Sequence, residues 1–201
     1  MSGDFYALAV SWEPFLCCAA PSLCLKGSLP ALVPHGLWPS SRTRNTPLYC
    51  DAEKRQQQPK RKNRKEHEWA KHGTCSGLEQ DLYFAEEARL MKGEAVKGLE
   101  NALFIHAKST AGQSSLRTIP VEDIVRGSER KVAVKAAKDC KLQELTVCFE
   151  KMDNGMVGKQ IDCPDSIMKR SRHTSRCARV ALETDQKCSV VEEDLLKAML
   201  K

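Results

Sequence analysis

The sequence lacks several features that define large classes of protein. No run of about 20 apolar residues is present, which is the length that a bilayer requires, so no membrane span is expected. The sequence also has no Asn-x-Ser/Thr site for N-linked sugar and no visible internal repeat. None of the ten cysteines belongs to a C-x-x-C pair, which argues against structural zinc. At 201 residues, the chain is expected to form one domain, spanning 1–201, and to be a monomer.

The ten cysteines and the net charge of +6 are informative. An even number of cysteines in a compact domain indicates disulfides and an oxidising compartment, with reduced cytosolic thiols as the alternative. The chain begins Met1-Ser2-Gly3-Asp4, without the basic and long apolar segments of a signal peptide. We give the cysteines more weight and expect a secreted or endomembrane-lumen protein, or a periplasmic one if the source is bacterial. The positive charge suits a polyanionic partner.

Hydrophobic patterning predicts both strands and helices. The apolar stretch Phe5–Trp12 predicts a buried strand, and the alternation over 142–150 predicts a central strand of an antiparallel sheet. Helical spacing of apolar residues predicts helices over 79–92 and 94–108. The inner faces of these helices are expected to carry Phe84, Ala88 and Met91 in the first and Val96, Leu99 and Leu103 in the second. Other expected elements are helices over 67–71, 120–126 and about 189–201, strands over 35–38, from 161 and over 179–182, a turn over 151–158, and loops over 17–34 and 39–65.

One stretch packs four reactive side chains into about one and a half helical turns. Residues 67–72 read His-Glu-Trp-Ala-Lys-His. Successive helical residues are rotated by about 100°, so the two histidines, Glu68 and Lys71 share one arc and Trp69 lies opposite, where it can be buried. A carboxylate beside one imidazole and an ammonium beside the other can hold them in different protonation states. Concerted acid–base chemistry needs this, and in-line phosphoryl transfer from a 2′-hydroxyl is a reaction that the groups suit.

A zinc-protease helix is one alternative for this stretch. It requires two histidines at i and i+4, whereas here the second stands at i+5 and Lys71 occupies the i+4 place. An ammonium is not a zinc ligand, so neither a metal nor another cofactor is expected. The other alternative is a solvated helix face with ordinary charges.

A second stretch resembles the first in its density of functional groups. Residues 34–39 read Pro-His-Gly-Leu-Trp-Pro and supply a third histidine, His35, and an aromatic side chain, Trp38. The indole can either stack on a nucleobase or be buried in the core.

Together the two stretches resemble the ribonuclease T2 family. The motifs His-Gly-Leu-Trp-Pro at 35–39 and His-Glu-Trp-x-Lys-His-Gly-Thr-Cys at 67–75 are unbroken, and the resemblance extends to the strand at 142–148. It implies an α+β fold, with a mainly antiparallel central sheet packed by helices and with long disulfide-tied loops, and the expected elements agree. It also implies metal-independent cleavage of single-stranded RNA to 2′,3′-cyclic phosphate ends, which are then hydrolysed more slowly.

The resemblance implies a role for five side chains. His72 would act as the general base that takes the proton of the 2′-hydroxyl. His35 would act as the general acid that protonates the leaving 5′-oxygen. His67 would bind the phosphate, and Glu68 and Lys71 would stabilise the crowded, negatively charged phosphorus.

Base recognition is where the chain departs from the family. Trp38 would stack on a base, but Ser40 stands where relatives often carry Asp or Asn to read the base edge. Pro34 replaces the usual apolar residue before His35, and the segment 40–66 is short. A catalytically weak member that binds RNA, or acts as an interaction or stress protein, is therefore kept as an alternative, although the five intact side chains favour the enzyme.

The resemblance also implies disulfides. The bond Cys50–Cys75 would tie the loop after the first motif to the end of the second and add about 3 kcal/mol to stability. One of the adjacent cysteines Cys17 and Cys18 is expected to pair with Cys24, leaving the other and Cys188 as a fifth bond or as free thiols. The remaining expected pairs are Cys140–Cys177 and Cys148–Cys163.

Overall fold

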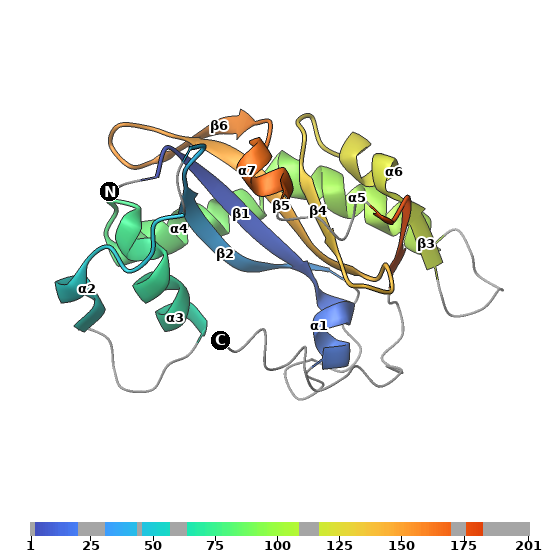
Figure 1. Ribbon diagram of the computed structural model, residues 1–201, viewed down its shortest axis with the longest axis horizontal. Coiled ribbons are helices and arrows are strands. Elements are labelled where there is room, and N and C mark those ends of the chain that lie inside the picture. The colour runs from blue at the N-terminus through green and yellow to red at the C-terminus, as the bar shows by residue number, and fades with distance from the viewer. Residues whose placement is uncertain are drawn as a thin grey trace.

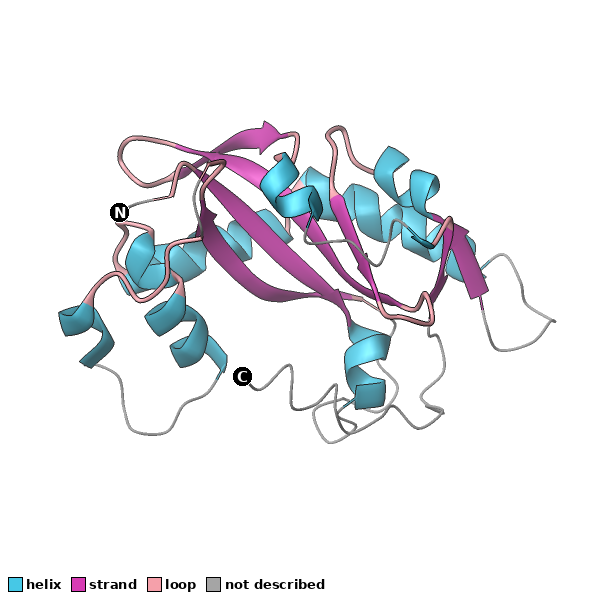
Figure 2. Ribbon diagram, in the orientation of Figure 1, coloured by secondary structure: helices cyan, strands magenta, loops and turns pink. Residues whose placement is uncertain are grey.

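The computed structural model describes residues 3–19, 31–43, 46–56, 64–108, 117–169 and 176–182. Its centre is an antiparallel sheet in the order β2-β1-β5-β4, in which β6 also pairs with β5; a second sheet pairs β3 with β7. Helices α4 and α5 lie behind the larger sheet in Figure 1 and α7 lies in front. Figure 2 shows the same layers by secondary structure, and the fold is α+β. The strands are β1 (Phe5–Trp12), β2 (Leu32–Ser40), β3 (Arg117–Pro120), β4 (Ala133–Ala136), β5 (Leu142–Lys151), β6 (Val157–Ile161) and β7 (Arg179–Leu182). The helices are α1 (Glu13–Ala19), α2 (Ala52–Gln56), α3 (Arg64–Lys71), the 3-10 turn η2 (Gly73–Cys75), α4 (Gln80–Met91), α5 (Glu94–Lys108), α6 (Val121–Arg126) and α7 (Asp165–Met168).

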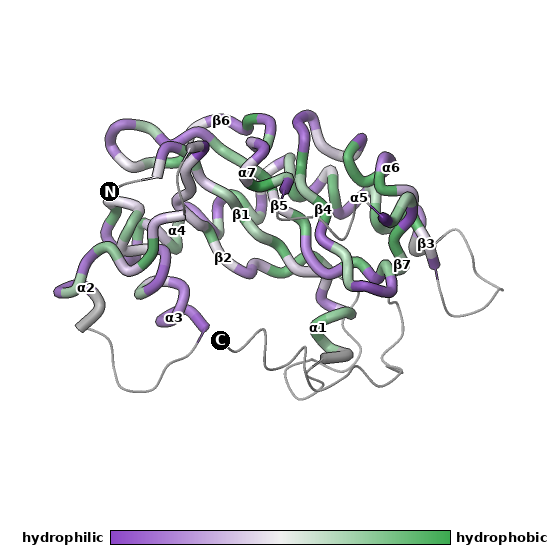
Figure 3. The backbone as a smooth tube through the Cα atoms, viewed as in Figure 1, coloured by the Kyte–Doolittle hydropathy of each residue, from purple (hydrophilic) through white to green (hydrophobic). Residues whose placement is uncertain are grey.

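The core lies on both faces of β1, and all eight residues of this strand are buried. A strand covered on both faces is apolar throughout, which explains the unbroken run in the sequence. Its larger side chains, such as Tyr6 and Trp12, join the main cluster with the helices. Phe5 and Ala7 join a smaller cluster around Cys148 on the other face. In Figure 3 the hydrophobic colour appears along β1, whereas α3 is mostly hydrophilic.

The expected strand at Phe5–Trp12, the helix over 94–108 and the strand over 179–182 are confirmed. The central strand is also confirmed as β5, with the predicted alternation of its faces. In α5, Val96, Leu99 and Leu103 form the buried face as predicted. These segments were predictable because each buries a regular apolar pattern.

The loop predictions were wrong in part. The stretch 17–34 was expected to be a loop, but α1 extends to Ala19 and β2 begins at Leu32. Helix α1 was missed because Glu13 and Pro14 suit the first turn of a helix as well as the end of a strand. Helix α2 occupies part of the stretch 39–65 that was expected to be irregular. The return strand β6 ends rather than begins at Ile161, because the turn is closed sooner, at Gly155 with a φ of 83°. Strands β3 and β4 and helix α7 were not predicted; each is only four residues long.

The predicted inner face of α4 was wrong in part, although Phe84 and Met91 are partly buried against the main cluster as predicted. The buried side chains of this helix are Tyr83, Glu86, Glu87 and Leu90, whereas Ala88 is exposed. Glu86 tolerates burial because its carboxylate accepts hydrogen bonds from Arg89 and from the backbone N–H of Val157. Such tertiary partners are not visible in a hydrophobic pattern, which places charged residues outside.

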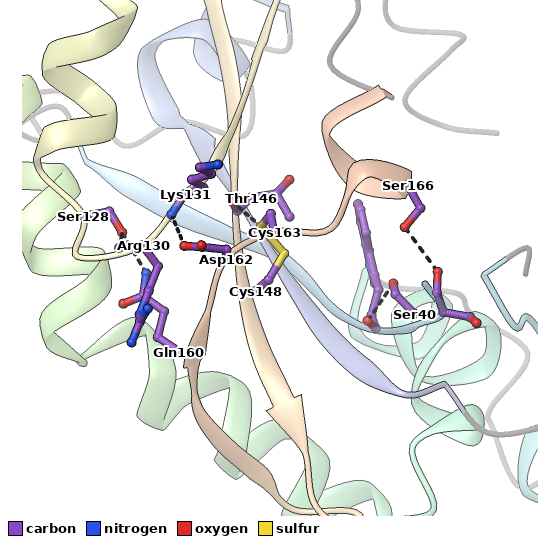
Figure 4. Close-up of a disulfide and its surroundings, with 12 residues drawn as sticks. Ser40, Ser128, Arg130, Lys131, Thr146, Cys148, Gln160, Asp162, Cys163 and Ser166 are labelled. Carbon is purple, nitrogen blue, oxygen red and sulfur yellow. Dashed lines mark hydrogen bonds between the residues drawn. A yellow bond between two sulfur atoms is a disulfide. The ribbon is translucent and has the colours of Figure 1, made fainter. Parts of the chain in front are cut away.

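Three disulfides form between the pairs that the resemblance implied, Cys50–Cys75, Cys140–Cys177 and Cys148–Cys163. Figure 4 shows the last of these, where Cys163 also lies beside the carbonyl of Thr146. Cys17 is disulfide-bonded, but Cys24 and Cys188 lie outside the described residues, as does the expected helix over 189–201. In the ranges that the structure describes, no helix is long and apolar enough to cross a membrane.

Candidate active site

The two motifs meet at the edge of the larger sheet. The first motif forms the second half of β2, the edge strand beside β1, and the second forms α3 and η2. His72 follows α3 directly and continues its hydrogen bonding, because its N–H donates to the carbonyl of Glu68 at 2.9 Å. The predicted helix is therefore present, and its last functional residue stands in the turn that ends it.

The imidazoles of the two motifs lie against the same indole. The ring centroid of Trp38 lies 5.1 Å from that of His35 and 5.2 Å from that of His72. The distance between the two imidazoles therefore cannot exceed the sum of these two values. His72 is buried, whereas about a third of the His35 side chain is exposed. Two titratable rings from segments far apart in the sequence thus share one small site.

Glu68 connects the motifs through Trp38. The indole Nε1 donates a 2.8 Å hydrogen bond to Oε2 of Glu68, whose side chain is buried. Gly36 makes this contact possible, because a Cβ at its position would overlap Oε2 of Glu68 and come within 2.5 Å of Trp38 Nε1. The half-buried indole is therefore not a fully buried core residue, and it links the two motifs.

Tyr83 of helix α4 contacts both motifs. Its hydroxyl donates to the carbonyl of Leu37 in the first motif at 2.5 Å, and its ring packs edge-on against Trp69 in the second, with centroids 5.6 Å apart. Burial raises the pKa of Tyr83, so the hydroxyl remains a donor. Gly73 completes the packing, because a Cβ there would overlap the indole of Trp69.

The disulfide Cys50–Cys75 joins the loop before α2 to η2, at the end of the second motif. Next to it, the N–H of Tyr49 donates to the carbonyl of Lys71 at 2.9 Å. His67 and Lys71 lie on α3, both half-buried. The loop is thus fixed to the end of the helix from which His72 follows.

Sequence reasoning missed one partner of His35. Nδ1 of the imidazole lies 2.5 Å from Oε2 of Glu144, a buried carboxylate on β5. The signal in the sequence was a carboxylate on the face of the central strand that lies opposite to Leu145, Val147 and Phe149.

Ser40 is not brought into the site. Its side chain is 1% exposed and its hydroxyl donates to the carbonyl of Trp38 at 3.1 Å, so it supports the end of β2. Among the described residues, no group of three or more His, Cys, Asp or Glu side chains is arranged to hold a metal ion.

A hollow of about 190 Å³ lies beside Glu68, between α3 and α4, with Pro34 and Phe84 in its wall. Glu87 also lines it, and only 8% of this residue is exposed. Burial raises the pKa of Glu87 above the ordinary value of 4.5, the charge of Glu68 adds to the effect, and Arg64 opposes it.

The change Glu87→Gln should therefore stabilise the protein at neutral pH. A carboxyl whose pKa is raised on folding contributes its full stability below its unfolded pKa and loses it as pH rises through the folded pKa. The melting temperature of the variant relative to wild type should thus increase between about pH 4 and pH 7. Glu86→Gln is the matched control with the opposite sign, because the hydrogen bond from Arg89 lowers the pKa of Glu86. Parallel pH dependence in the two variants would contradict this assignment.

Two known ribonucleases are similar to this chain in sequence. No family model matches the chain. It is 25% identical to Ribonuclease S-4 of Pyrus pyrifolia over 199 residues, covering 85% of this chain and 84% of that protein. It is 39% identical to a ribonuclease of Aeromonas hydrophila over 89 residues, covering 38% of this chain and 40% of that protein.

Solved structures share the fold. Trichomaglin, described as an S-like ribonuclease, aligns with a TM-score of 0.61 at 20% identity, over 81% of this chain and 92% of its own. Ribonuclease MC1 from bitter gourd seeds aligns with a TM-score of 0.55 at 23% identity, over 80% of this chain and 94% of its own. A mutant of ribonuclease MC1 was solved in complex with 5′-UMP. At these identities the structures show a shared fold.

Proposed function

Because the motifs and the fold of this chain fit the ribonuclease T2 family, we propose that it is an endoribonuclease that cleaves single-stranded RNA without a metal ion. The observation that carries the proposal is the contact of His35 and His72 with the same indole, which is itself bonded to Glu68. General acid–base catalysis needs two titratable groups held near one reacting bond. The basic net charge of +6 is complementary to the RNA backbone.

The proposed first step is transphosphorylation. His72 takes the proton of the 2′-hydroxyl, and the 2′-oxygen attacks the adjacent phosphorus. As the bond from phosphorus to the 5′-oxygen breaks, His35 delivers a proton to that oxygen, leaving a 2′,3′-cyclic phosphate and a free 5′-hydroxyl. Hydrolysis of the ring follows more slowly, with a water in place of the leaving alcohol.

In this proposal the other motif residues bind the phosphate, stabilise its negative charge and hold the catalytic groups in position. His67 binds the phosphate, and Lys71 stabilises the charge that accumulates on the phosphoryl oxygens in the transition state. Glu68 is held by the indole Nε1 of Trp38, so its carboxylate has a fixed position relative to the two imidazoles. Trp38 lies beside both imidazoles, where its indole contacts a base of the substrate in this proposal.

We also propose that the protein acts in a secreted or lumenal compartment. The three disulfides between described residues support this, because such bonds persist in oxidising compartments.

A digest of single-stranded RNA in the presence of EDTA tests the function. We expect cleavage to continue at an unchanged rate and the early products to carry 2′,3′-cyclic phosphates, identified by mass. DNA of the same sequence is the control and should stay intact, because it lacks the 2′-hydroxyl. Loss of RNA cleavage on adding the chelator, or binding of RNA without cleavage, would refute the proposal.

A further inference from the structure

Glu144 lies outside both motifs, yet its side chain touches a motif histidine. It belongs to β5, and its carboxylate Oε2 lies 2.5 Å from Nδ1 of His35 on β2. The Glu144 side chain is 9% exposed, and its other oxygen lies 4.0 Å from Nζ of Lys135. Burial of a carboxylate to this extent is costly unless the carboxylate has a hydrogen-bonding or charged partner.

The fold builds this contact across an intervening strand. β1 lies between β2 and β5, so the two side chains bridge two strand spacings, about 10 Å. In the β1 register, Ser11 faces both Val33 of β2 and Glu144 of β5. Ala9 and Ser11 are the β1 residues on this face that pair with the strand segments next to His35 and Glu144, and their small side chains leave room for the imidazole to reach the carboxylate.

A β-bulge in β2 sets the direction of the His35 side chain. Ala9 pairs with Gly36 and the next residue, Val10, pairs with Pro34, so His35 is the extra residue of β2. A bulge at this position turns a side chain out of the regular alternation, and bulges are frequent beside active sites. The side chain of His35 therefore owes its orientation to two features, the bulge in its own strand and the carboxylate of β5.

We propose that Glu144 is a positioning residue for His35 in the cleavage reaction, an inference that rests on the proposed function. A carboxylate accepts the Nδ1 proton, so Nε2 is the atom that turns to the substrate. In the proposed step the Nε2 proton passes to the leaving 5′-oxygen as its bond to phosphorus breaks, while the proton on Nδ1 stays in the bond to Glu144. Glu144 touches neither the substrate nor the reacting atoms.

Two substrates with different leaving groups separate this role from a structural one. A dinucleoside monophosphate has a 5′-alkoxide leaving group that needs a proton, whereas uridine 3′-(4-nitrophenyl phosphate) releases a stable phenolate that does not. For Glu144→Ala we expect kcat on the dinucleotide to fall about 100-fold with KM changed less than about 2-fold, and kcat on the nitrophenyl ester to fall less than about 3-fold. Glu144→Gln keeps an oxygen that accepts the Nδ1 proton, so it should lose only about 10-fold on the dinucleotide.

Glu150→Gln is the matched control. Glu150 lies on the same strand and face as Glu144, and it pairs with Lys159 at 3.5 Å instead of with a histidine. We expect its kinetics to stay within about 2-fold of wild type on both substrates. Melting temperatures report folding; if Glu144→Ala does not fold, the Glu144→Gln variant carries the test.

The outcomes are distinct. Equal losses on both substrates, or no loss on the dinucleotide, would overturn the positioning role while leaving the proposed function intact. Wild-type protein that cleaves neither substrate would overturn the proposed function and this inference with it. Nitrogen-15 NMR adds a readout free of turnover: wild-type protein and the Glu150→Gln variant should keep the proton on Nδ1 of His35, and Glu144→Ala should not. An unchanged His35 spectrum in Glu144→Ala would overturn the inference.

Discussion

Replacing either His35 or His72 with alanine should lower kcat on single-stranded RNA by about 10³-fold, because each change removes one end of the proposed proton transfer. The two rings lie against the same indole but have different roles in the proposed step, so neither is expected to replace the other. Comparing kcat and KM for each variant with wild type checks the result. KM should change far less than kcat, because both groups act mainly in the transition state.

His106→Ala is the matched control for this pair. His106 lies on α5, outside both motifs, and pairs with Asp123 at 3.4 Å. Its removal should leave kcat unchanged, and the melting temperatures of the variants should show whether the fold is intact. If the His35→Ala or His72→Ala variant kept a near-full rate, the assigned roles would be wrong.

The second large effect on kcat is expected when a single methyl group is added at position 36. Gly36→Ala places a Cβ where it overlaps Oε2 of Glu68 and comes within 2.5 Å of Trp38 Nε1. The hydrogen bond between these two side chains cannot keep its present geometry, so the Glu68 carboxylate or the Trp38 indole must move away from position 36. We expect a loss of about 100-fold or more in kcat and a destabilisation of about 1–3 kcal/mol from overpacking. Activity assays and denaturant unfolding measure the two effects separately.

Gly93→Ala is the appropriate comparison, because its Cβ would approach no atom closer than the carbonyl oxygen of Leu90 at 3.1 Å. It should retain wild-type activity. A Gly36→Ala variant that cleaves RNA at the wild-type rate would show that the close approach of the motifs is not required.

Local sequence patterns predicted an element and its buried face correctly where the pattern lies within one segment. The unbroken apolar run of β1 and the helical spacing of Val96, Leu99 and Leu103 each specify an element and its buried face. The two motifs likewise identified His35 and His72 as functional candidates, and resemblance supplied three disulfide pairs that the structure forms.

Patterns failed where the burial of a polar side chain depends on the hydrogen-bond partners that the folded chain provides. Glu86 is charged, yet it is buried because Arg89 and the backbone N–H of Val157 donate hydrogen bonds to its carboxylate. Ser40 was expected near the substrate, yet its hydroxyl is used by its own strand. Short segments such as α2 and β4 gave no usable periodicity, because four or five residues cover too few turns or repeats.

The sequence by itself determined which side chains are available for chemistry and where the longer strands and helices lie, because residue type and apolar period are local properties. Only the tertiary structure decided that both imidazoles lie against Trp38, that Gly36 admits Glu68, and that Glu144 reaches His35 over β1. These contacts depend on sheet order, on one bulge and on small side chains in a third strand. No single segment encodes such an arrangement, because it exists only when all of the segments pack together.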